Sequence, residues 1–133
     1  MPIRFNAAAG GGDTYGQALL GPVDNEVQLP VPLSGLTNAE IDAHGYVKPG
    51  LPLTKSGALV GASPAFVYGV TIEAVKVADD NATGTIAALG TQDIAVATVG
   101  QVIRAIAEDN LGRVYTANEA AGFDRAGSKL VLI

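Results

Sequence analysis

Alternating apolar and polar side chains along the chain predict several short β-strands. The strongest signal covers residues 66–77, where both alternating faces carry apolar side chains, as in a strand inside a fold. Residues 85–89 and 93–99 are rich in β-branched side chains and predict two further strands. Residues 129–133 predict a last strand, whose apolar character indicates that it is buried in a sheet.

A strand, a tight turn and a second strand are predicted in the first half of the chain. Residues 47–53 form the first strand, and Pro49 and Pro52 place it at a sheet edge because proline cannot donate a main-chain hydrogen bond. Residues 54–57 contain the glycine of a turn, and residues 58–60 form the second strand.

Helical signals are short. Thr37 and Glu40 have the spacing of a capping box and predict a helix of two turns at most, which Gly45 can end. Apolar residues at helical spacing predict a helix within residues 102–112, and Thr116 with Glu119 forms a second capping-box signal.

Residues 1–35 predict an extended arm in front of a β-rich domain at residues 36–133. Consecutive glycines and several prolines disfavour a regular helix in the arm, but its apolar side chains are too many for a segment meant only for water. Val27, Leu29 and Val31 alternate with other residues and predict a strand that needs an edge to pair with. The arm either packs on its own domain or becomes ordered on a partner, and the sequence leaves both open.

Composition agrees with a single, mainly β domain with short helices. The chain has 133 residues, of which 48% are hydrophobic and 5% aromatic, so its core must consist mainly of Val, Ile and Leu. Its 17 Gly and 7 Pro interrupt the backbone too often for long helices, because Gly costs roughly 1 kcal/mol and Pro about 3 kcal/mol inside a helix.

Net charge and the remaining composition exclude several classes of binding partner and site. A net charge of −5 argues against a nucleic-acid binder, which needs a basic surface. The chain lacks Cys, which excludes disulfides and thiolate metal sites. It has no apolar run of about 18 residues that could span a membrane, and no signal-peptide pattern. We therefore expect a soluble protein made in the cytoplasm, with no nucleic-acid or membrane partner.

Candidate catalytic and metal-binding residues are few. His44 is the only histidine, so a histidine metal cluster is impossible and a Ser-His-Asp arrangement would depend on it alone. Residues 79–84 match the first half of a calcium loop, but Gly90 stands where that loop has a bidentate Glu. Glu108 and Asp109 lie at a predicted helix end, where a solvated pair is the ordinary case. We predict no catalytic, cofactor-binding or metal-binding residues and no enzyme activity.

The order of these segments resembles that of the lambda-type head decoration proteins of tailed phages. The resemblance covers roughly residues 46–133, and it depends on order and spacing rather than on one specific motif. It lies in five segments, which are Tyr46-Val47-Lys48-Pro49-Gly50-Leu51-Pro52-Leu53, Ala58-Leu59-Val60-Gly61, Val67-Tyr68-Gly69-Val70-Thr71, Asp93-Ile94-Ala95-Val96-Ala97 and Ala126-Gly127-Ser128-Lys129-Leu130-Val131-Leu132-Ile133.

The resemblance implies a small single β domain of the β-clip or β-tulip type. It implies a homotrimer that binds the major capsid protein at three-fold and quasi-three-fold positions on the outside of the expanded head and stabilises the shell. In that family the N-terminal segment contacts the capsid. Five apolar arm residues are therefore the predicted capsid contacts: Ile3, Phe5, Val27, Leu29 and Val31.

Two other classes of function stay open. A small trimeric β enzyme with sites between subunits would need converging polar residues, for which Asp93, Arg104, Arg113 and Arg125 are the candidates. A soluble ligand-binding module would need an apolar pocket, which is hard to build with four Tyr, three Phe and no Trp.

Overall fold

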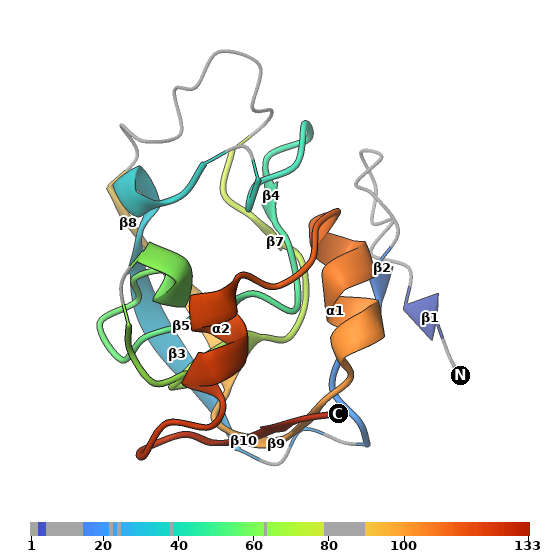
Figure 1. The fold of residues 1–133 in the computed structure, drawn as a ribbon. Coiled ribbons are helices and arrows are strands. Elements are labelled where there is room, and N and C mark those ends of the chain that lie inside the picture. Colours follow the sequence, from blue (N-terminus) through green and yellow to red (C-terminus); the bar gives the residue numbers. More distant parts are fainter. Residues whose placement is uncertain are drawn as a thin grey trace.

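The computed structural model describes residues 3–4, 15–21, 23, 25–37, 39–62, 64–78 and 90–133, and these form a mainly β domain with short helices (Figure 1). The strands are β1 (Ile3–Arg4), β2 (Tyr15–Gly16), β3 (Glu26–Pro32), β4 (Tyr46–Val47), β5 (Pro52–Leu53), β6 (Gly69–Thr71), β7 (Val75–Lys76), β8 (Thr91–Ala97), β9 (Val99–Val102) and β10 (Lys129–Leu132). The helices are α1 (Arg104–Leu111) and α2 (Ala117–Gly122), with 3-10 turns η1 (Leu33–Gly35) and η2 (Val60–Ala62). The predicted fold class, mainly β with short helices, is confirmed.

The main sheet has the strand order β3-β8-β6-β5 and is antiparallel throughout. Strands β3 and β8 pair over seven residues each, with Leu29 opposite Ile94. On the inner face of this pair, Leu29, Val31, Ile94 and Val96 are almost completely buried, whereas Val27 is half-buried and Gln92 at the end of the pair is exposed. The predicted strand at residues 93–99 is therefore confirmed as β8, and it lies at the centre of the core.

The predicted strand at residues 66–77 is divided between two sheets. β6 joins the main sheet, whereas β7 pairs with β4. Gly69 permits the close approach of β6 to β8, because a Cβ there would lie 2.6 Å from a methyl carbon of Val96. The apolar alternation correctly predicted burial of β6, but it carries no signal for the change of sheet after Thr71.

The predicted turn at residues 54–57 is confirmed. The main-chain N–H of Thr54 donates to Ala58 O, and Leu53 forms an isolated bridge with Leu59. Gly57 has a φ of 84°, and a Cβ there would lie 2.3 Å from Pro30 O. Glycine is therefore required where this turn meets β3.

The predicted helix at residues 37–44 does not form. Glu40 accepts hydrogen bonds from the main chain and hydroxyl of Thr37 at 2.7 and 2.9 Å, but the chain makes only a single turn. Asp42 then accepts main-chain hydrogen bonds from His44 and Tyr46, which redirects the chain into β4. Local carboxylate bonding thus replaces the second helical turn.

The other two helical signals are confirmed. α1 ends at Gly112, whose φ of 72° suits a left-handed cap. α2 begins with the reciprocal capping box of Thr116 and Glu119. No helix within the described ranges is long and apolar enough to cross a membrane.

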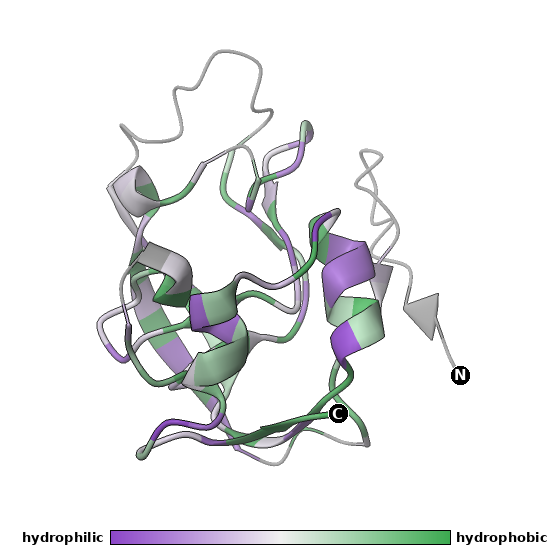
Figure 2. Ribbon diagram, in the orientation of Figure 1, coloured by the Kyte–Doolittle hydropathy of each residue, from purple (hydrophilic) through white to green (hydrophobic). Residues whose placement is uncertain are grey.

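The C-terminal strand β10 pairs in parallel with β9, in a sheet separate from the main one, and Leu130, Val131 and Leu132 make most of β10 hydrophobic (Figure 2). The predicted strand at residues 129–133 is therefore confirmed. Its predicted burial is wrong for part of the segment, because only Leu130 is buried whereas Val131 and Ile133 are 55% and 52% exposed.

The predicted strand at residues 85–89 and the acidic turn at 79–84 lie outside the described residues.

Candidate functional site

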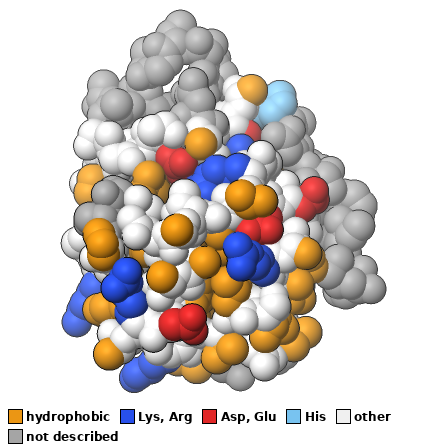
Figure 3. Space-filling model, viewed as in Figure 1, with side chains coloured by type: hydrophobic (Ala, Val, Ile, Leu, Met, Phe, Trp, Pro, Cys, Tyr) orange, Lys and Arg blue, Asp and Glu red, His pale blue; other side chains and the backbone are white. Residues whose placement is uncertain are grey.

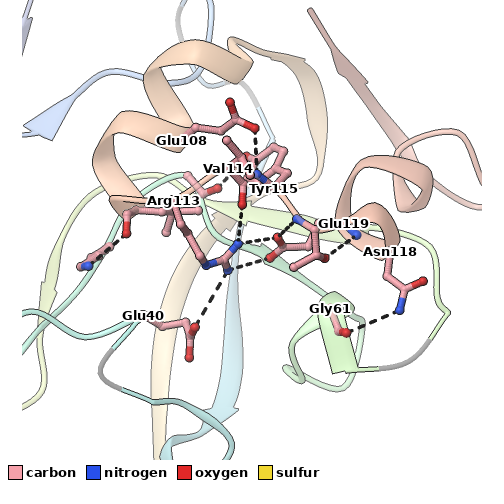
Figure 4. Close-up of polar contacts among 12 residues, drawn as sticks. Glu40, Gly61, Glu108, Arg113, Val114, Tyr115, Asn118 and Glu119 are labelled. Carbon is pink, nitrogen blue, oxygen red and sulfur yellow. Dashed lines mark hydrogen bonds and ion pairs between the residues drawn. The ribbon is translucent and has the colours of Figure 1, made fainter.

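A cluster of charged side chains, partly open to solvent at Arg113, lies where α2, the α1–α2 connection and the turn that contains Glu40 meet (Figure 4). Arg113 donates to both carboxylate oxygens of Glu119, at 2.7 and 3.0 Å. The same guanidinium lies 3.9 Å from the carboxylate of Glu40. Both carboxylates are buried, with 1% and 4% of Glu119 and Glu40 exposed. We call these three residues the Arg113 cluster.

Local sequence places each member of the Arg113 cluster. Gly112 ends α1 and lets the chain turn so that Arg113 points back toward α2. Glu119 is the third residue of α2 and also accepts a hydrogen bond from the main chain of Thr116 at 2.8 Å. Glu40 is held in the same way by Thr37. Both carboxylates are therefore oriented by their own turns before they meet the guanidinium.

The pKa values around the cluster follow from its contacts. Hydrogen bonding to Glu119 raises the pKa of Arg113, against the effect of its partial burial. Burial raises the pKa of Tyr115, whose hydroxyl donates to Gly50 O at 2.7 Å. The main-chain N–H of Tyr115, followed by the Arg104 guanidinium, lowers the pKa of Glu108. These groups hold their ordinary charge states near neutral pH.

This arrangement links separate parts of the chain through satisfied contacts. Among the described residues, every buried side-chain N or O atom has a hydrogen-bond partner. The Arg113 cluster joins α2 to the turn before β4, and Tyr115 joins the same connection to the loop before β5. Arg113 makes two hydrogen bonds to Glu119 and only a longer contact to Glu40. Removal of Arg113 would therefore leave two buried carboxylates without a cation, and removal of Glu119 would leave the guanidinium without its closest partner.

The polar candidates for an enzyme site do not converge within the chain. Asp93 is exposed on β8, and Arg104 pairs with Glu108 on α1 at 2.9 Å. Arg113 belongs to the cluster, and Arg125 is exposed in the turn after α2. His44 is exposed, and no group of three acidic or histidine side chains suited to a metal ion occurs in the part of the chain that the structure describes.

A shallow cavity of about 190 Å³ lies between two loops. Its lining residues are Pro32, Ser34, Gly35, Leu36, Gly57, Ala58 and Leu59. This volume is below the roughly 300 Å³ at which small-molecule sites usually begin, and the lining offers one hydroxyl and no charged side chain. The cavity can therefore hold an apolar side chain more readily than a polar ligand.

The outer face of the β9–β10 sheet exposes apolar side chains. Val99 pairs with Lys129, and Val131 pairs with Gln101, so these side chains share one face, while Leu130 and Val102 point to the opposite, buried face. Ile133 follows in the same alternation.

Leu20 extends this face on the other side of β9. Leu19 forms an antiparallel bridge with the buried Val102, so the next residue, Leu20, points outward beside Gln101, to whose carbonyl it donates at 3.0 Å. The four apolar residues Leu20, Val99, Val131 and Ile133 are 54%, 46%, 55% and 52% exposed. We call them the apolar strand face. The sequence correctly predicted that β10 is apolar, but it carries no signal that only one face of the strand packs against the core.

The predicted capsid contacts are separated by the structure. Leu29 and Val31 are 5% and 0% exposed and lie in the protein's own core, because β3 is paired along its whole length with β8. Val27 is half-buried against the same core. Their packing favours the alternative that this part of the arm belongs to its own domain. Ile3 lies in β1, which pairs with β2, and Phe5 lies outside the described residues.

The N-terminal segment is also attached to the domain at residues 15–20. Gly16 and the side chain of Asn110 on α1 exchange two hydrogen bonds, at 2.9 and 2.8 Å. The hydroxyl of Tyr15 donates to the buried Asp42 at 2.6 Å. Tyr15 and Gly16 are therefore fixed to the domain, and Ile3 and Arg4 pair with them as β1.

No protein-family model, no curated protein and no solved structure matches this chain.

Proposed function

We propose that this protein is a structural component of a phage virion. It binds the major capsid protein on the outer surface of the expanded head as a homotrimer and stabilises the shell. The proposal draws on the order of the segments at residues 46–133, which resembles that of lambda-type decoration proteins.

The observation that carries the proposal is the apolar strand face on a small domain in which the buried side-chain polar atoms of the described residues all have partners. Exposed apolar surface of this kind marks sites of contact with other proteins. A decoration protein works by burying surface across the joints between capsid subunits, so that many weak contacts act together.

The capsid-binding part of the arm is proposed to be residues 1–14 rather than 1–35. Leu29 and Val31 are needed for the core, and the hydrogen bonds of Tyr15 and Gly16 fix the following residues to the domain. Ile3 and Phe5 keep their proposed role as capsid contacts. A segment that precedes Tyr15 can add to an exposed strand of another protein through main-chain hydrogen bonds.

Co-sedimentation with expanded and unexpanded empty shells tests the function. Saturable binding to expanded shells alone is expected, and absence of binding to both shells would contradict the proposal.

A truncated chain that lacks residues 1–14 tests the arm. It loses β1, which pairs only with β2, but it should keep its fold because it retains Tyr15, Gly16 and all of β3, and it should lose most shell binding. Retention of full affinity would show that the arm is not the contact. A deletion through residue 31 is unsuitable for this purpose because it removes most of a core strand.

A further inference from the structure

We infer that the apolar strand face binds a second copy of this chain, head to tail, against the outer face of the β3–β8 pair. The inference rests on the proposed function in one respect, because a homotrimer requires a self-contact whose residues the sequence did not indicate. It assigns that contact to two different surfaces of the same protein.

The first surface is mainly apolar, with the exposed Gln101 between Leu20 and Val131. Its four apolar side chains are about half exposed, and all but Leu20 are β-branched or lie on regular strands. Side chains with restricted rotamers lose little conformational entropy when a partner covers them. Figure 3 shows hydrophobic side chains over the lower part of the molecule, where Figure 1 places β9 and β10.

Charge selects against a contact between two identical copies of this face. Lys129 is the charged side chain among the outward residues of β9 and β10, beside Val99. A symmetric contact would bring two Lys129 side chains into one interface with no acidic side chain from these strands to oppose them. The sign of the charge instead favours an acidic surface as the partner.

The outer face of the β3–β8 pair is such a surface. Glu26 and Asp93 are both exposed on it, and neither strand contains Lys or Arg. Pro30, directly opposite Asp93, and Pro32 add exposed apolar area with fixed backbone geometry. The two surfaces therefore complement each other in both charge and apolar character.

A contact between two different surfaces is heterologous, and such contacts close into a ring when the rotation between copies permits. A three-membered ring is what the proposed homotrimer needs. Leu20 belongs to the apolar strand face, so each self-contact would also include the segment that follows the anchored residues 15–19.

The test is the mass of the full-length protein measured by sedimentation over a wide range of concentrations. Val131→Glu places a negative charge on the apolar strand face, opposite the acidic surface, and should raise the dissociation constant for self-association by at least about tenfold. Val114→Glu is the matched control, because Val114 is 70% exposed in the α1–α2 connection and away from β9 and β10 (Figure 1). It should leave the dissociation constant unchanged.

Charge exchange tests the pairing without altering the apolar residues. Lys129→Glu and Glu26→Lys should each weaken self-association, and the double variant should recover most of the loss. Both positions are exposed, so the variants should fold like the original protein, which circular dichroism checks.

Three results would overturn the inference. These are a wild-type protein that remains monomeric at millimolar concentration, equal effects of Val131→Glu and Val114→Glu, and no recovery in the double variant. If Val131→Glu removes shell binding and leaves the mass unchanged, the face binds the capsid protein instead, which rejects the self-contact but keeps the proposed function. Self-association through this face without any shell binding would reject the proposed function alone.

Discussion

The β3–β8 pair and the β9–β10 pair use similar side chains but cover them differently. In β3–β8, Leu29 and Ile94 point into the core while Glu26 and Asp93 face outward. In β9–β10, apolar side chains occupy both faces, and only the inner face is covered. The apolar side chains of the first pair pack mainly against the chain's own core, whereas the second pair leaves apolar side chains exposed that a partner can bury.

The Arg113 cluster, like the first pair, makes its contacts within the chain. Its charges are paired across three segments, and its carboxylates are oriented by capping hydrogen bonds. Substitutions of the buried side chains should lower the stability of the fold, whereas substitutions of the exposed side chains on the apolar strand face should affect assembly.

The largest effect on folding is expected from Glu119→Ala. This change leaves the Arg113 guanidinium without its closest partner and removes the capping box of α2. The free energy of unfolding should fall by about 3 kcal/mol, as for other broken buried ion pairs. Urea unfolding measures it, with Asp109→Ala on the exposed side of α1 as a control that should change stability by no more than about 0.5 kcal/mol. A loss of stability below about 1 kcal/mol would show that the Arg113 cluster contributes little to the stability of the fold.

The next effect compares the same substitution in the two strand pairs. Val31→Ala should lower the free energy of unfolding by about 2 kcal/mol, because its side chain is fully buried and its removal leaves a cavity. Val131→Ala should change it by no more than about 0.5 kcal/mol, because that side chain is 55% exposed. The two variants should be compared by denaturant unfolding at a concentration where the protein is monomeric. Similar losses of unfolding free energy in the two variants would mean that the Val131 side chain is packed as tightly as that of Val31.

Much of the fold could be predicted because its signals are local. The capping box at Thr116, the glycine that ends α1 and the alternation in β8 each specify their structure within a few residues. The same local logic failed at residues 37–44, where Asp42 offers the main chain an alternative to a second helical turn. It also could not show that residues 66–77 divide between two sheets.

The candidate surfaces were harder to predict because they depend on contacts between distant segments. Val31 and Val131 are both valines in apolar strands, yet one is fully buried and the other is exposed. Nothing near Arg113 in the sequence indicates that Glu40, more than seventy positions earlier, lies beside it. The sequence therefore indicated which segments are apolar, but not which of their side chains the core would bury.

A smaller effect is expected where the N-terminal segment is attached to the domain. Asn110→Ala removes both hydrogen bonds to Gly16 and should lower the free energy of unfolding by about 1 kcal/mol. It should also speed hydrogen exchange of the Gly16 amide. The matched control is Asn118→Ala, whose single contact to Gly61 O is 3.5 Å long and should contribute much less. Unchanged exchange at Gly16 would show that other contacts hold this segment.

The smallest expected effect is the pH dependence of stability that comes from Glu108, whose side chain is half-buried. Its pKa is lowered in the folded protein, first by the main-chain N–H of Tyr115 and then by Arg104. A lowered pKa means that the ionised carboxylate adds stability above its unfolded pKa of about 4.3 and that this gain is lost as pH falls through the folded value.

Glu108→Gln should therefore be less stable than the original protein at neutral pH, and the difference should shrink toward zero as pH falls below about 4. Thermal midpoints from about pH 7 down to about pH 3 measure this difference. High salt should reduce the part due to Arg104, which is exposed, and leave the part due to Tyr115. A difference that grows in acid would mean that Glu108 is held in its protonated form, and the connection between α1 and α2 would then not depend on its charge.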